Sequence, residues 1–246
     1  MLRALPDARQ AQRCTYSLVR LVWSELMMLI GGIGSRYAMQ GESQDWQFAL
    51  ALDRLAGEPD SRLPAPHPDT PYVFLQTLPP ETLAAIFPAL FRAFLKQRCF
   101  DDFRYHGYWL IAIDATWVRS FKYPHCAHCL RQRQADGSIK YMHAVCEAKV
   151  LLSNGMVIPL LSEAIENDDP FASKQDCERK AFVRLAAELK REFPRLPICL
   201  VMDALYCCGP VLQRCEAKGW QYIIVCKPGN SPTLYEAAKA AAMAGT

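Results

Sequence analysis

The stretch Leu110-Ile111-Ala112-Ile113-Asp114 is a run of apolar residues that closes on a single acid. A second stretch further along the chain, Cys199-Leu200-Val201-Met202-Asp203, repeats the pattern. A lone carboxylate at the end of a buried strand is costly unless it has a partner, a metal ion or water. The pattern therefore predicts a shared role for Asp114 and Asp203 if their two strands are neighbours.

Turn signals around the first stretch predict an antiparallel meander of three strands. The apolar runs Trp109–Val118, Tyr141–Leu152 and Met156–Ile165 are separated by Asp136-Gly137 and by Asn154-Gly155. Asp-Gly and Asn-Gly between apolar runs are strong hairpin signals because both residues accept positive φ. Pro159 cannot donate a ladder hydrogen bond, so the third run is expected at the sheet edge.

The rest of the chain alternates helices and strands. A helix with its cap near Ser173 is expected to end at Pro194, and the run Ile198–Met202 has the length of a buried parallel strand. A helix after Pro210 and a fifth strand at Tyr222–Cys226 follow. Right-handed crossovers place the fourth strand beside the first and parallel to it. The predicted fold class is thus α/β with a mixed sheet of order 3-2-1-4-5, the order of the RNase H-like fold.

The sequence divides into two regions by its periodicity. Residues 1–105 are expected to be mainly helical, with a possible DNA-end-binding role, and one apolar helical face around Phe91 contains the helix-breaking Pro88. Residues 106–246 form the expected RNase H-like domain, incomplete at its C-terminus.

Composition limits the class of protein without naming it. The 246 residues are about half apolar, carry a net charge of +3, and show neither a secretory signal nor an apolar run long enough to span a bilayer. Eleven cysteines without an export signal are expected to be reduced thiols. The sequence therefore predicts a cytoplasmic protein that does not enter a membrane.

Asp114 and Asp203 suit the chemistry of phosphoryl transfer. Acids on neighbouring strands lie roughly 5 Å apart, and two-metal sites hold their cations about 4 Å apart. Oxygen ligands favour Mg²⁺ or Mn²⁺. The alternative is that both acids are ordinary turn or capping residues at strand ends.

Four short motifs resemble those of insertion-sequence DDE transposases of the type with a late β-rich insertion. The resemblance covers about residues 65–236 and implies two divalent metals bound by Asp114 and Asp203, cleavage and joining of transposon-end DNA, and a homodimer. The motifs are Ile111-Ala112-Ile113-Asp114-Ala115-Thr116, Lys174-Gln175-Asp176-Cys177-Glu178, Asp203-Ala204-Leu205-Tyr206 and Gly219-Trp220-Gln221-Tyr222-Ile223.

Such transposases also carry a third carboxylate, a glutamate on a helix after the insertion. Glu236 has suitable spacing but is expected to be an ordinary surface residue, while Glu147, Glu163 and Glu166 lie on strands leading away from Asp203. The chain is therefore expected to be a fragment that binds DNA weakly and cleaves it poorly.

Cysteine and histidine residues gather near the first hairpin. Cys126 and Cys129, with His143 and Cys146, offer four ligands in two close pairs, a set that suits zinc. However, residues 143 and 146 point to opposite faces of a regular strand, so a bulge, or His125 or His128 as a substitute ligand, would be needed. The alternative is two reduced cysteines in a polar loop.

Basic residues could supply a DNA surface in an otherwise weakly charged chain. The candidates are Lys122, Arg131, Arg133, Lys140 and Lys227; the alternative is a solvated hairpin. Two other functions remain open: a non-catalytic nucleic-acid-binding module with a zinc-like hairpin, and an RNase H-like nuclease unrelated to transposition.

Overall fold

The computed structural model describes residues 2–59, 61–167, 176–229 and 232–244. The chain divides into two compact units, Met1–Ile86 and Phe87–Thr246. The first unit is helical and contains η1 (Leu2–Ala4), η2 (Ala11–Arg13), α1 (Leu18–Ile30), α2 (Arg36–Glu42), α3 (Trp46–Ala56), α4 (Asp69–Leu75) and α5 (Pro80–Ala84).

The first unit has its own small core and a buried ion pair. Leu21 on α1 packs with Phe74 and Leu78 in one apolar cluster. Arg20, the residue before Leu21, is fully buried and forms an ion pair with Asp53 on α3. A buried pair of this kind is tolerated only when its remaining polar groups are hydrogen-bonded. The Arg20 guanidinium meets this condition in part, since it also donates to the Leu63 carbonyl at 2.7 Å.

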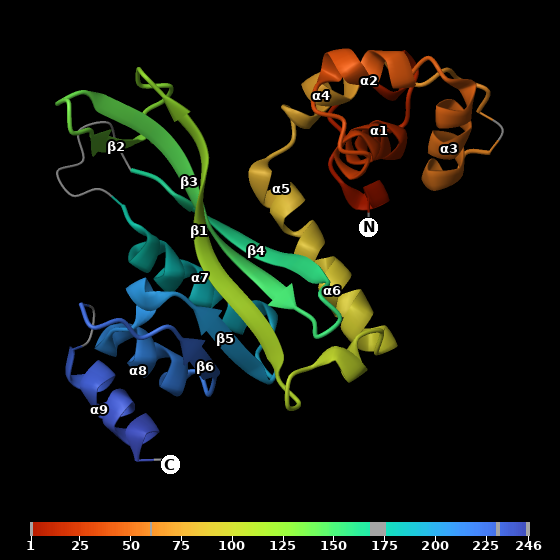
Figure 1. The fold of residues 1–246 in the computed structure, drawn as a ribbon. Coiled ribbons are helices and arrows are strands. Elements are labelled where there is room, and N and C mark those ends of the chain that lie inside the picture. Colours follow the sequence, from red (N-terminus) through yellow and green to blue (C-terminus); the bar gives the residue numbers. More distant parts are fainter. Residues whose placement is uncertain (1, 60, 168–175, 230–231, 245–246) are drawn as a thin grey trace. The chain divides into compact units, whose positions relative to one another are not determined.

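The second unit is a mixed α/β layer structure (Figure 1). It contains α6 (Ile86–Gln97), η3 (Asp101–Phe103), β1 (Trp109–Phe121), β2 (Leu130–Arg133), β3 (Ile139–Leu151), β4 (Val157–Ile165), α7 (Glu178–Glu192), β5 (Ile198–Met202), η4 (Ala204–Tyr206), α8 (Gly209–Ala217), β6 (Gln221–Ile224) and α9 (Pro232–Met243). The predicted cap at Ser173 lies outside the described residues.

The six described strands form one open sheet around β1. β1 pairs antiparallel with β3 and parallel with β5, and β5 pairs parallel with β6. The prediction that the strand ending at Asp203 lies beside the first strand and parallel to it is therefore confirmed. β1 and β3 remain paired well past the end of β5, toward the hairpin that carries β2 (Figure 1).

The predicted strand order is wrong at the outer edge of β3, where a sixth strand was not expected. β2 pairs antiparallel with the first part of β3 and β4 with the rest. The Asp136-Gly137 turn consequently joins β2 to β3 and does not join β1 to β3. The physical reason is that β3 extends beyond β4, which leaves an unpaired edge for a short strand to cover.

β4 is an edge strand, as Pro159 predicted. Within the described residues β4 pairs with β3 alone, and Pro159 lies opposite Lys149. The register shifts next to this pair, where Leu160 is an extra residue between Pro159 and Leu161. The bulge leaves Leu160 fully buried in the core.

The main core lies between the sheet and the helices α6 and α7. Phe91 on α6 is fully buried and meets Trp109 of β1 and Phe193 edge-on, at centroid distances of 5.2 and 5.6 Å. This packing joins α6 to the second unit, so the units divide before the predicted boundary at residue 105. The predicted break near Pro88 is seen between α5 and α6.

Among the described helices, none alone is long and apolar enough to cross a membrane. The bent pair formed by α4 and the segment of α5 and α6 has sufficient length and apolar composition, and nothing more supports a membrane span there.

Candidate carboxylate site and cysteine-histidine cluster

Asp114 and Asp203 lie side by side where β5 ends: Asp203 follows the last residue of β5, whereas Asp114 lies within β1, which continues to Phe121 and does not end at the acid as the sequence predicted. The last pair between the parallel strands is Ile113 with Met202, so the two acids are the next residues on neighbouring strands. Both residues are exposed. One carboxylate oxygen of each is oriented by a local backbone N–H: Ala115 donates to Asp114 at 2.9 Å and Leu205 donates to Asp203 at 2.8 Å.

A third carboxylate, Glu178, belongs to the same group. Glu178 is the first residue of α7 and is half-buried. Burial raises the pKa of Glu178, and the negative charges of Asp203 and Asp114 raise it further, against a hydrogen bond from Tyr206 that lowers it. The negative charges of Asp114 and Asp203 thus both act on Glu178.

A buried tyrosine, Tyr206, supports the Glu178 side chain. Tyr206 lies three residues after Asp203, is fully buried, and meets the ring of Phe182 on α7 at 5.3 Å. Its hydroxyl hydrogen-bonds to the Glu178 side chain and lies 3.6 Å from Cys146 Sγ. Because Phe182 follows Glu178 by about one helical turn, this contact fixes the start of α7 over the end of β5.

Three other acids around the sheet have cationic partners. Lys149 Nζ lies 2.8 Å from Glu147, the residue opposite Asp114 in the sheet. Arg184 forms ion pairs with Glu163 and with Asp176, the latter at 2.7 Å. In the described part of the chain, by contrast, no salt bridge involves Asp114, Asp203 or Glu178. Among the described residues, the charges that act on Glu178 are therefore not offset by an ion pair.

The sequence did not single out Glu178 as a site residue. It was quoted only as the end of the Lys174–Glu178 motif, because its approach to Asp203 depends on how α7 lies on the sheet. One sequence signal could have identified Glu178: it is an acid in the first turn of a helix that connects strands of the sheet that carries Asp114 and Asp203. Glu236, considered earlier as the third acid, is exposed on α9.

The cysteine and histidine candidates separate into those that converge and those that do not. The ligand atoms of Cys126, Cys129 and His143 all lie within 4.8 Å of one another. Cys146 is fully buried beside Tyr206, on the other face of β3, and burial raises its thiol pKa to about 11. His128 is engaged elsewhere, because its Nδ1 lies 2.9 Å from the Asn167 carbonyl oxygen.

Four of the five basic candidates lie on one extension of the sheet, which we call the arm and define as residues 116–143. Within the arm, Trp117 and Tyr123 are largely exposed, and Lys140 Nζ lies 5.0 Å from the Trp117 ring centroid. Exposed aromatic rings among cations are typical of nucleic-acid surfaces. The four are Lys122, Arg131, Arg133 and Lys140; Lys227 is exposed after β6.

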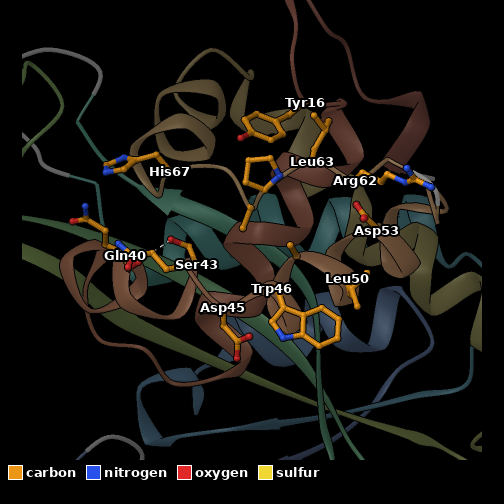
Figure 2. A pocket seen from close by; sticks show the side chains of 14 residues that line it. Tyr16, Gln40, Ser43, Asp45, Trp46, Leu50, Asp53, Arg62, Leu63 and His67 are labelled. Carbon is orange, nitrogen blue, oxygen red and sulfur yellow. Dashed lines mark hydrogen bonds between the residues drawn. The ribbon is translucent and has the colours of Figure 1, made fainter.

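The first unit contains a hollow of about 720 Å³ (Figure 2). Trp46 and Tyr16 contribute to its walls, and Asp53 lies at its edge. The Asp53 carboxylate accepts a hydrogen bond from Ser61 at 2.5 Å and pairs with Arg20. The Asp53 charge is therefore neutralised within the fold, and Asp45 is the other acid among the described residues that line the hollow.

Comparisons with known proteins identify no family. No protein-family model matches the chain, and no curated protein matches it. Among solved structures, a chain from the "Crystal structure of a pre-cleavage Mos1 transpososome" aligns with a TM-score of 0.21 and 8% identity, over 96% of this chain and 68% of that one. A similarity at this level carries no argument about fold or function.

Proposed function

We propose that the second unit is an RNase H-like phosphoryl-transfer domain of the DDE transposase type, which cleaves and joins DNA. The observation that carries the proposal is that Asp114 and Asp203 are neighbours on two adjacent parallel strands, with Glu178 at the start of α7 within reach of their charges. The path β3-β1-β5-β6, with β4 paired to β3 beside the additional strand β2, supports the RNase H-like assignment.

The three acids are suited to binding a divalent cation, because all three are negatively charged when ionised. Their donor atoms are all carboxylate oxygens, which Mg²⁺ and Mn²⁺ prefer. The raised pKa of Glu178 reflects burial and like charge, and a bound cation would reverse that repulsion. Asp114, Asp203 and Glu178 are therefore the residues expected to hold the metal.

When bound, a pair of such cations activates the attacking water or 3′-hydroxyl and stabilises the leaving oxygen. The protein's own contribution is positioning. Backbone N–H groups orient one oxygen of Asp114 and one of Asp203, and the Tyr206 hydroxyl holds Glu178. Because Tyr206 is fully buried against Phe182, this support is rigid.

The arm is the proposed contact surface for DNA. Its cations would meet phosphates, and the exposed rings of Trp117 and Tyr123 would contact sugars or bases. Lys227, which is exposed after the end of β6, is proposed as a further phosphate contact. Assembly as a homodimer on DNA ends is part of the same proposal and rests on the sequence resemblance alone.

The first test is metal binding by the full chain, measured by Mn²⁺ titration with electron paramagnetic resonance. We expect saturable binding that Asp114→Asn and Asp203→Asn each weaken by about tenfold or more, the scale seen when metal-site residues are changed. Glu236→Gln is the matched control, since Glu236 is an exposed acid on α9.

The second test is Mn²⁺-dependent nicking of supercoiled plasmid DNA by the same proteins. Nicking that Asp114→Asn abolishes and Glu236→Gln leaves intact would support the proposal. Equal Mn²⁺ binding by the wild type and by the Asp114→Asn/Asp203→Asn double variant would contradict it, and would favour a non-catalytic nucleic-acid-binding module.

A further inference from the structure

Within the described residues, Cys126, Cys129 and His143 form a group whose metal-ligating atoms all lie within 4.8 Å of one another. Cys126 and Cys129 lie in the loop between β1 and β2, and His143 lies on β3. The two Sγ atoms are 3.9 Å apart, and His143 Nε2 is 3.4 Å from Cys126 Sγ and 3.5 Å from Cys129 Sγ.

These three separations are the edges expected around a tetrahedral zinc ion. Zinc bonds to sulfur at about 2.3 Å and to nitrogen at about 2.0–2.1 Å, so tetrahedral ligands lie about 3.8 Å apart for two sulfurs and about 3.5 Å apart for sulfur and nitrogen. A disulfide needs its sulfur atoms at about 2.0 Å, and it gives no reason for an imidazole nitrogen to lie equally close to both.

A register shift between β1 and β3 determines where His143 lies. A bulge at Val118 shifts the register of β1 against β3, so that Arg119 and not Val118 lies opposite His143. The His125 backbone N–H donates to Cys129 Sγ at 3.4 Å, a bond that stabilises negative charge on the sulfur. The rings of His125 and Phe121 stack at 4.6 Å beside the cluster.

We propose that Cys126 Sγ, Cys129 Sγ and His143 Nε2 bind one Zn²⁺ as three of its ligands. The ion fastens the loop of residues 122–129 to β3 and so fixes the shape of the arm. A short exposed loop that cannot build its own apolar core gains stability from such a metal. The site is distinct from the carboxylate site and does not depend on the function proposed there.

The test is the zinc content of the full chain, purified after expression with zinc and measured by mass spectrometry of the metal. We expect about one zinc per chain, because the described residues offer one such group of ligands. Cys126→Ser, Cys129→Ser and His143→Gln should lose the metal. Cys99→Ser and His128→Gln are the controls, because Cys99 is an exposed thiol outside the cluster and His128 contacts Asn167.

A cobalt-substituted wild-type protein gives a readout that does not depend on the variants folding. Tetrahedral Co²⁺ with two thiolate ligands should show intense visible bands and a sulfur-to-cobalt charge-transfer band, both removed by a chelator. Two outcomes would overturn the proposal: a wild-type chain that binds no zinc or cobalt after reconstitution, or undiminished zinc in the Cys126→Ser/Cys129→Ser variant.

Discussion

At the scale of single residues, Glu178 is held half-buried near the negative charges of Asp203 and Asp114. Asp114, Asp203 and Glu178 have no cationic partner among the described salt bridges, whereas Glu147, their neighbour in the sheet, is paired with Lys149. Groups that are costly in the isolated fold and converge at one place are typical of functional sites. Neutralising one of these carboxylates should therefore weaken metal binding without lowering the stability of the fold.

The variant Glu178→Gln tests this expectation. The folded-state pKa of Glu178 is raised, so the folded chain binds this proton more tightly than the unfolded chain. Stability is then lost as the pH rises from the unfolded pKa through the folded one, and at pH 7 the ionised Glu178 costs stability. Metal-free Glu178→Gln should melt at the same temperature as the wild type, or higher, at pH 7.

The same variant should bind Mn²⁺ about tenfold or more weakly. Thermal melts at pH 7 and below pH 4 provide the control, since the stability difference should vanish where the carboxyl is protonated in both states. A large loss of stability at pH 7 with unchanged Mn²⁺ affinity would show that Glu178 has only a structural role.

At the scale of elements, the hairpins set the register that brings the site together. Gly155 has φ +85° in the turn between β3 and β4, and a Cβ placed there would meet no atom within 4 Å. Its role is therefore purely conformational, because an L side chain is strained at positive φ. The Asn154 side chain completes the turn by accepting from the Met156 N–H at 3.0 Å.

Gly155→Ala should destabilise the second unit by about 1–2 kcal/mol, the cost of a non-glycine residue in the left-handed region. Gly209→Ala is the matched control: its added Cβ also meets no atom within 4 Å, but Gly209 does not have positive φ and begins α8. Urea unfolding measures both. Equal stabilities would show that the turn relaxes without strain.

At the scale of the whole molecule, the chain has two separate cores. The core of the second unit surrounds β1 and α7, whereas that of the first unit surrounds α1 and α4. The Arg20–Asp53 pair lies in the first unit. Damage to this pair should therefore leave the carboxylate site intact.

Arg20→Met should destabilise the first unit by about 3–5 kcal/mol, because it leaves the Asp53 carboxylate buried without its partner. Arg36→Met is the control, since the pair of Arg36 with Asp69 is exposed and should contribute less than about 1 kcal/mol. Calorimetry and Mn²⁺ titration together measure the outcome. A parallel loss of Mn²⁺ binding in folded Arg20→Met would show that the two units are coupled.

Much of the second unit could be predicted from local sequence. The Asn154-Gly155 turn, the edge position of Pro159 and the parallel pairing of the two acid-bearing strands follow from side-chain period, turn chemistry and crossover handedness. The trio Cys126, Cys129 and His143 was also named from spacing, and the opposite orientation of Cys146 follows from the two-residue period of a strand.

What only the tertiary structure decided is how distant segments meet. Glu178 approaches Asp203 because Phe182 packs on Tyr206, β2 covers the edge that β4 leaves unpaired, and the bulge at Val118 sets the place of His143. Local periodicity determines which residues form a strand and which face each occupies. Contacts between a helix end and a strand end depend on packing angles and on register, which no short stretch of sequence contains.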